Sequence, residues 1–308
     1  MSWLLDPLRA DFVLRALLGG ALVAVICGIV GTWVVIRGMA FLGEAIGHGM
    51  LPGVALATVV GAPVLVGAAV SAAIMSGAIG LLQRRGRLSY DTSIGLLFVG
   101  MLSLGVIIVS HSRSFATDAT AMLFGDVLAV DDGDIVVLAG ALVVTIAVAV
   151  SFHRAFVATA FDRRIARTLG LRPQAAHVAL VGLVTLAVVA SYQAVGSLLV
   201  VGLLLAPAVA ARPWTTRIAA TMALASAVGV LAVATGLVVS WNAGTAAGAS
   251  IACAAILFAG LSGVLRGALD SVRRRPHGTQ LGGTDRLPAV EPAGTTHQRA
   301  VAPSAVSR

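Results

Sequence analysis

A carboxyl and an imidazole stand four residues apart inside a long apolar part of this chain. Glu44 and His48 lie within FLGEAIGHGMLPG, residues 41–53, and Glu44 is the only glutamate before Glu291. Positions four apart share one face of a helix, so the two side chains can present an oxygen and a nitrogen to a common point. Zinc takes such ligands, and manganese accepts the same atoms. Two ligands make an incomplete site, which the symmetry of a homodimer would double.

The same stretch has a second interpretation, in which Glu44 and His48 cap or hydrogen-bond a broken helix. Gly47, Pro52 and Gly53 surround the pair and indicate irregular or closely packed backbone. An ionisable side chain in hydrocarbon costs at least ~2.5 kcal/mol on insertion scales. Irregular backbone at that depth is tolerated mainly where it is buried in protein or lines a watery cavity. These facts favour a pathway through a membrane without identifying what passes along it.

The composition indicates a polytopic membrane protein. Of the 308 residues, 58% are hydrophobic and 11% are charged, and the mean hydropathy is +0.99. A soluble domain needs far more polar residues to cover its surface. Small residues are frequent and favour close helix packing, so we expect an all-α transmembrane bundle. Apolar runs of about 20 residues, the length that crosses a bilayer, occur at 12–36, 43–60, 63–83, 93–110, 134–152, 175–191, 194–211, 217–239 and 245–265.

The charged residues orient these nine runs, although eight crossings remain possible if one early segment is re-entrant. With nine crossings, four arginine groups fall on one side, which the positive-inside rule makes the cytoplasm. The opposite side receives residues 111–134, which hold five aspartates against Arg113 alone. His111, beside this acidic stretch, is a weaker candidate for passing a cation inward. The arginine groups are Arg84, Arg85 and Arg87; Arg154, Arg163, Arg164, Arg167 and Arg172; Arg212 and Arg217; and Arg266 with Arg273, Arg274 and Arg275.

Two further features bound the function. The chain contains no Lys, which excludes a P-loop nucleotide site, because that motif needs Lys. We therefore expect no ATPase activity in this chain, no bound cofactor and no nucleic-acid partner. Residues 1–269 are expected to form the membrane domain. Residues 270–308 are rich in Pro, Gly, Thr and Arg, and we expect them to be a disordered cytoplasmic tail.

Three segments resemble the permease subunits of bacterial zinc, manganese and iron ABC importers. They are FLGEAIGHGMLPGVALA (41–57), YDTSIGLLFVG (90–100) and VGSLLVVGLLLAPAVAA (195–211). The acidic position of the first is commonly Asp in that family, and Glu44 keeps the charge on a longer arm. The resemblance assigns Glu44 and His48 to the pair that contacts or gates the ion. The matching structural positions are Pro52, Gly53, Asp91, Gly95, Gly196 and Pro207.

A fourth segment, FDRRIARTLGL (161–171), resembles the stretch of these permeases that docks on the ATPase. Phe161, Ile165 and Leu169 repeat at helical spacing, which predicts a short amphipathic helix. Such a helix could instead lie on anionic lipid. Family members often have an acidic residue where Arg164 stands. The docking residues implied by the resemblance are Phe161, Asp162, Arg163, Arg164, Ala166, Leu169 and Gly170.

The resemblance implies a type II-like homodimeric permease in the bacterial cytoplasmic membrane. Its expected partners are two copies of a cytoplasmic ATP-binding subunit and an extracytoplasmic metal-binding protein. The function that follows is ATP-driven import of a divalent metal ion by alternating access, with zinc preferred and manganese or iron as alternatives. The residues also leave open a proton-coupled secondary transporter acting through Glu44, a carrier of larger metal chelates, and a scaffold that transports nothing.

Overall fold

The described part of the protein is all-α, as expected. A computed structural model describes residues 11–84, 89–110, 125 and 127–273, and these residues contain helices and no strand. Nine helical segments within these residues are long and apolar enough to cross a membrane, which confirms the predicted polytopic all-α bundle. The long helices are α2 (Asp11–Ile36), α5 (Val64–Arg84), α6 (Tyr90–Ser110), α8 (Asp132–Ser151), α11 (Pro173–Val195), α12 (Ser197–Ala211), α13 (Ile218–Ala243) and α14 (Ala247–Arg273).

The remaining span consists of two helices placed end to end, α3 (Ala40–Gly49) and α4 (Leu51–Val60), which together form a 21-residue crossing. Short helices fill the connections: η2 (Val127–Ala129), α9 (His153–Phe161), α10 (Arg163–Thr168) and η3 (Arg212–Trp214). The helix α14 continues to Arg273, four residues beyond the predicted end of the membrane domain at 269. The tail was predicted from residue 270, and its residues from 274 onward lie outside the described part of the structure. His111 also lies outside the described residues.

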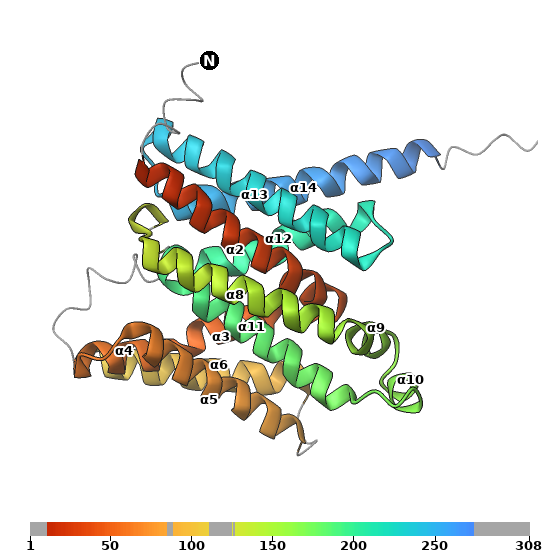
Figure 1. Ribbon diagram of the computed structural model, residues 1–308, viewed down its shortest axis with the longest axis horizontal. Coiled ribbons are helices and arrows are strands. Elements are labelled where there is room, and N and C mark those ends of the chain that lie inside the picture. The colour runs from red at the N-terminus through yellow and green to blue at the C-terminus, as the bar shows by residue number, and fades with distance from the viewer. Residues whose placement is uncertain (1–10, 85–88, 111–124, 126, 274–308) are drawn as a thin grey trace, which may run out of the picture.

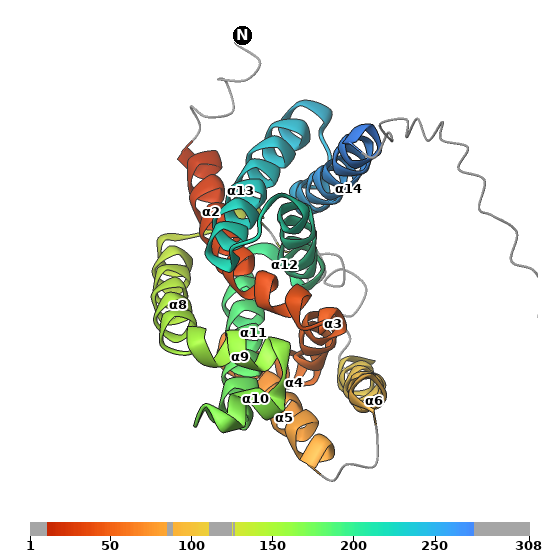
Figure 2. The ribbon, with the colours of Figure 1, turned by 90° about the vertical axis from the view of Figure 1, so that its right-hand side faces the viewer.

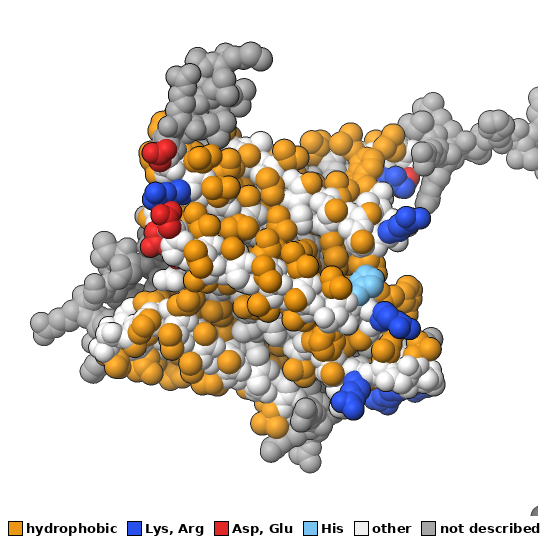
Figure 3. Space-filling view, viewed as in Figure 1, with side chains coloured by type: hydrophobic (Ala, Val, Ile, Leu, Met, Phe, Trp, Pro, Cys, Tyr) orange, Lys and Arg blue, Asp and Glu red, His pale blue; other side chains and the backbone are white. Residues whose placement is uncertain are grey.

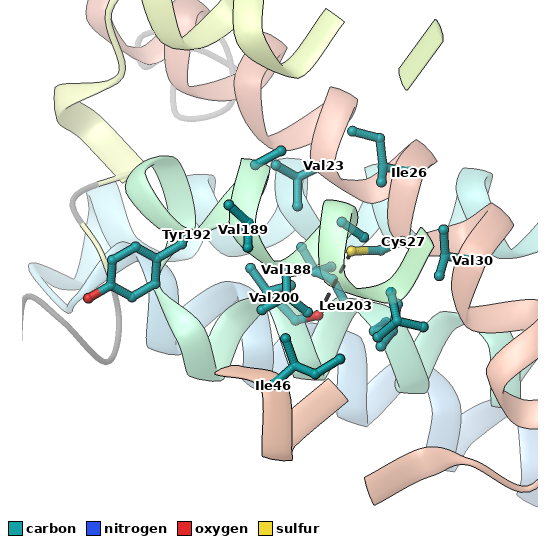
Figure 4. Packing of buried hydrophobic residues seen from close by; sticks show 14 of the residues in the cluster. Val23, Ile26, Cys27, Val30, Ile46, Val188, Val189, Tyr192, Val200 and Leu203 are labelled. Atoms are coloured by element: carbon teal, nitrogen blue, oxygen red, sulfur yellow. Dashed lines mark hydrogen bonds between the residues drawn. The ribbon is translucent and has the colours of Figure 1, made fainter. Parts of the chain in front are cut away.

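Four of the described spans form the centre of the bundle. In α2, the α3–α4 span, α11 and α12 more than half of the most apolar window is buried, whereas in α6 and α14 only 17% is. Figures 1 and 2 show α2 between α13 and α8, with α6 and α14 on opposite outer sides. Figure 4 shows the core, where Cys27 of α2 lies against α11 and α12 and its thiol points to the carbonyl of Val200 at 3.9 Å. The outer helices therefore have faces left for lipid or for other chains.

Small residues permit the close helix crossings that the composition predicted. A Cβ added to Gly31 of α2 would lie 1.8 Å from the carbonyl oxygen of Leu204 in α12. Between α4 and α5, a Cβ on Gly53 would lie 2.1 Å from the carbonyl oxygen of Gly67, and one on Gly67 would lie 2.3 Å from that of Gly53. Backbones that touch in this way are typical of membrane helix pairs. The Gly53–Gly67 crossing holds α4, and with it the end of α3, against α5.

Charged side chains gather at the two ends of the bundle (Figure 3). We call one end the acidic end, defined by Asp11, Asp131, Asp132 and Asp134, where Arg15 pairs with Asp132 at 3.5 Å. The other is the arginine-rich end, where α2 ends, α9 and α10 lie, and α11 and α13 begin. Its described arginines include Arg37, Arg154, Arg164, Arg167, Arg172, Arg212, Arg217 and Arg266.

Candidate functional site

The helix α3 brings Glu44 and His48 together as their spacing predicted. Oε1 of Glu44 and Nε2 of His48 lie 2.8 Å apart, within hydrogen-bonding distance. The side chain of Glu44 is 28% exposed and that of His48 is 17% exposed. The pair is therefore neither locked in solid packing nor fully open on the surface of the single chain.

The opposite wall of this site comes from α6, which runs beside α3 (Figure 2). The imidazole of His48 packs edge-on against the ring of Phe98, with 5.3 Å between ring centroids. Phe98 also contacts Phe41, one turn before Glu44, at 5.6 Å. Within the described residues, Nδ1 of His48 is buried and has no hydrogen-bond partner. The aromatic wall orients the imidazole, and the acidic partner holds its other nitrogen.

The break between α3 and α4 follows directly from the sequence. Pro52 has no backbone N–H, so it cannot bond the carbonyl of His48 four residues earlier. The amide of Met50 bonds Ile46 at 3.1 Å and that of Val54 bonds Met50 at 3.0 Å, so the helix resumes after the break. The Glu44–His48 pair therefore lies directly before a break in the span, and the carbonyl of His48 accepts instead from the amide of Met50.

The chemistry available to this pair is the binding of one cation. An oxygen and a nitrogen 2.8 Å apart can both reach an ion with bond lengths of about 2.1 Å. The ion would replace the proton that the two groups share. No group of three or more His, Cys, Asp or Glu side chains that could hold a metal occurs among the described residues. A complete coordination shell therefore needs water, backbone carbonyls or a second chain in addition to this pair.

The other predicted motif residues are dispersed around the site. Asp91 is exposed in the first turn of α6, and a Cβ on Gly95 would meet open space. Pro207 is buried inside α12. Gly196 joins α11 to α12 with φ +72°, a left-handed conformation that suits glycine. These positions shape the helices, and none of them contributes a ligand to the pair.

The predicted docking segment lies at the arginine-rich end, where α9 and α10 project from the bundle (Figure 1). It is not the single amphipathic helix that the spacing of Phe161, Ile165 and Leu169 predicted. The chain is extended at Asp162, with φ −156° and ψ 130°, so α9 ends at Phe161 and α10 starts afresh. The carboxylate of Asp162 accepts a hydrogen bond from the amide of Arg164 at 2.6 Å. This side-chain cap favours a new helix start over continuation.

The segment nevertheless presents apolar and basic groups outward. Phe161 is 84% exposed and Leu169 is 64% exposed, whereas Ala166 is buried. Arg164 is exposed, and Gly170 ends the helix with φ +71°. The side chains of Arg163 and Ile165 lie outside the described part of the structure. An exposed phenylalanine and leucine beside arginines are suited to contact with another protein chain.

Two residues with contacts between distant segments carried weak sequence signals or none. Phe98 lies within the segment 90–100 that resembles the permeases but had no predicted role, because its contact with His48 joins segments 50 residues apart. Arg37 was not singled out, since a lone arginine after an apolar run is ordinary. It donates through Nη2 to the carbonyl of Phe156 at 3.5 Å and to the hydroxyl of Thr159. The contact of Arg37 with α9 joins distant segments, so only the folded chain reveals it.

Comparisons with known proteins agree with this fold. The ABC 3 transport family matches residues 9–264. The manganese transport system membrane protein MntC of Halalkalibacterium halodurans is 35% identical over 261 residues, which cover 84% of this chain and 89% of that protein. A Haemophilus influenzae protein named "Probable iron transport system membrane protein" is 32% identical over 250 residues, covering 81% and 92%. The solved structure of PsaBC from Streptococcus pneumoniae in complex with Fab superposes with a TM-score of 0.75 at 32% identity, covering 84% of this chain and 94% of that chain.

Proposed function

This chain belongs to the ABC 3 transport family, and from that premise we propose that it is the membrane-spanning subunit of an ATP-driven importer of divalent metal ions. Manganese is the first candidate cargo and iron the second. The observation that carries the proposal is the Glu44–His48 pair, whose oxygen and nitrogen meet at 2.8 Å within a membrane span. The ion would enter from the side of the acidic end, pass this pair and leave at the arginine-rich end.

The partial exposure of the pair supports a homodimer. A carboxylate that faced lipid would carry a high free-energy cost, yet the Glu44 side chain is 28% exposed in the single chain. A second copy placed against α3 and α6 would cover it and contribute a second Glu44 and a second His48. Two oxygens and two nitrogens would then surround one ion, in line with the incomplete donor set of a single chain.

The cargo is inferred from chemistry and from relatives together. A carboxylate and an imidazole accept manganese, iron and zinc. The imidazole of His48 alone favours zinc, but the relatives MntC and the Haemophilus influenzae protein carry manganese and iron in their names. Those names favour manganese or iron as the ion that this chain carries.

The arginine-rich end supplies the contact with an ATPase. The positive-inside rule places this end in the cytoplasm, so α10 would face the cytoplasmic ATP-binding subunits, one for each copy of this chain. Their binding and hydrolysis of ATP would move α10 and open the dimer alternately to each side. An extracytoplasmic binding protein would deliver the ion at the acidic end.

Reconstitution into liposomes tests the function. The chain is purified with its ATP-binding subunit and supplied outside with the metal-loaded binding protein and inside with ATP. We expect uptake of radioactive manganese or iron that ceases without ATP. Uptake driven by a proton gradient in the absence of ATP would instead support the secondary transporter. Uptake of a metal chelate unaffected by free manganese, iron or zinc would support the chelate carrier.

A further inference from the structure

Arg37 links the span that carries the metal pair to the helix that leads into α10. It follows the last residue of α2 and precedes the first residue of α3, Ala40, by three positions. Its Nη2 donates to the backbone carbonyl of Phe156 at 3.5 Å and to Oγ1 of Thr159, and both residues belong to α9. A side chain in the connection between α2 and α3 is thus bonded to a helix more than a hundred residues away in the sequence.

Aromatic packing fixes the same junction. The guanidinium of Arg37 lies over the ring of Phe156, 5.5 Å from its centroid, a distance at which a cation–π attraction operates. Trp33, one turn earlier in α2, packs against that ring with 5.2 Å between centroids. Trp33 and Phe156 are both 0% exposed. The helix α9 therefore cannot shift along the end of α2 without breaking this cluster or carrying Arg37 with it.

An arginine that only obeyed the charge asymmetry of a membrane protein would direct its head group to water or lipid phosphates. Arg37 is instead partly buried and donates to a neighbouring helix. The connections on both sides are short: Asp162 alone separates α9 from α10, and Gly38 and Met39 alone separate Arg37 from α3. Because these connections are short, they can absorb little of a displacement of α10 before it reaches α3.

We propose that Arg37 is a positioning residue that transmits movement of α9 and α10 to α3, so that ATP hydrolysis in the partner reorients Glu44 and His48. The inference rests on the proposed function, in which α10 docks on the ATPase. Coupling of this kind requires a continuous physical connection between the two sites. Here the connection consists of the Arg37–Thr159 hydrogen bond and the Trp33–Phe156–Arg37 cluster.

The test measures metal uptake and ATP hydrolysis on the same proteoliposomes, which contain the full chain, its ATP-binding subunit and the binding protein. Arg37→Met keeps an apolar stem over Phe156 but removes the donors. Thr159→Val removes the acceptor and leaves the shape of α9 unchanged. We expect each variant to assemble and hydrolyse ATP while metal uptake per ATP falls about fivefold. Arg37→Lys, which keeps a charged donor, should recover part of that ratio.

Matched controls are available in the same chain. Thr235 bonds the carbonyls of Leu231 at 2.7 Å and Ala232 at 3.2 Å, the pattern that Thr159 makes with Ala155 at 2.6 Å and Phe156 at 3.2 Å. Thr235→Val should therefore leave the uptake ratio unchanged. Arg266 lies over the ring of Trp214 at 5.7 Å, so Arg266→Met controls for the loss of an arginine stacked on an aromatic ring.

A double-mutant cycle separates coupling from a general loss of stability. If Arg37 and Thr159 act through their shared bond, the double variant loses no more coupling than Arg37→Met alone. Additive losses, or an uptake ratio equal to that of the unaltered chain, overturn the inference. If Arg37→Met fails to assemble, the Thr159→Val ratio decides alone. Absence of ATP-driven uptake by the unaltered chain refutes the proposed function instead, so the two failures can be told apart.

Discussion

At the scale of single residues, the imidazole of His48 can be removed with little structural cost. The side chain is partly exposed and packs edge-on against Phe98, and alanine has a high helix propensity. We expect His48→Ala to reduce metal uptake by about 100-fold or more, since half of the donor set is lost. The measurement is uptake in liposomes, with ATPase co-purification as the check on folding. Uptake equal to that of the unaltered chain would remove the pair from the mechanism.

Substitutions of Glu44 can separate the effect of its negative charge from the effect of its side-chain length. Glu44→Gln keeps the length of the side chain and can still hydrogen-bond His48, but it no longer supplies an anionic oxygen to a cation. We expect metal affinity to fall by at least about tenfold. Glu44→Asp keeps the charge on a shorter arm and should retain most of the affinity. Equilibrium dialysis of the purified complex with manganese measures both, and equal affinity for Gln and Glu at this position would contradict the direct contact.

The same pair responds to acid in a defined direction. Both groups must be deprotonated to bind a cation, so protons compete with the metal. We expect metal binding by the purified complex to weaken as the pH falls and to release protons on saturation. Glu44→Gln, which has one titratable ligand fewer, should show a shallower dependence of affinity on pH. A steeper or identical dependence would show that other groups bind the ion.

At the scale of elements, α10 and its flanking residues offer a test of docking. Phe161 and Leu169 are largely exposed, and a central apolar contact is worth about 2 kcal/mol in many interfaces. We expect Phe161→Ser and Leu169→Ser each to weaken association with the ATP-binding subunit by about 30-fold. Phe12→Ser, at the acidic end of α2, is the control. Unchanged association combined with weaker binding to anionic vesicles would instead favour a lipid-surface helix.

The crossing of α4 and α5 tests the small-residue packing behind the site. Gly53→Ala places a Cβ 2.1 Å from the carbonyl oxygen of Gly67, a backbone atom that cannot rotate away. We expect a loss of about 1–3 kcal/mol in stability, seen as a lower thermal midpoint of the purified protein. Gly77→Ala on α5 meets no atom within 4 Å and should leave that midpoint unchanged or raise it. Equal midpoints for the two variants would show that the helices separate easily.

The elements differ in how far the sequence could predict them. Long apolar runs identified every described membrane span, because a bilayer fixes the minimum length of a crossing. Most boundaries were right within about four residues, but the last run was predicted to end at 265 and its helix continues to Arg273. Pro52 likewise indicated the irregular backbone that follows α3. The division of α9 from α10 was missed, since the period of Phe161, Ile165 and Leu169 suits one helix. The carboxylate of Asp162 caps a new helix at this point, although the apolar periodicity suits a continuous one. Such a cap bond can be identified only when the backbone around it is known.

At the scale of the whole molecule, contacts between distant segments were the least predictable. The pairing of Glu44 with His48 is local and follows from helix geometry. The contacts of His48 with Phe98 and of Arg37 with Thr159 join different helices, so they depend on how the spans pack. Spans that are apolar all round carry little information about which face meets which neighbour. For the same reason, the surface that contacts a second chain could not be predicted, because faces that meet lipid and faces that meet another chain are both apolar.

Ion stoichiometry tests whether the complete site lies between two chains. If each copy supplies Glu44 and His48 to a shared ion, the purified assembly binds one manganese or iron ion per two copies of this chain. A mixed assembly with one unaltered copy and one His48→Ala copy would then bind the ion weakly, because one damaged copy spoils the single shared site. Two independent sites would instead give one ion per chain, and the mixed assembly would keep half of its full-affinity binding. Binding measured on assemblies with different affinity tags on the two copies distinguishes these outcomes, since the tags allow the mixed species to be isolated.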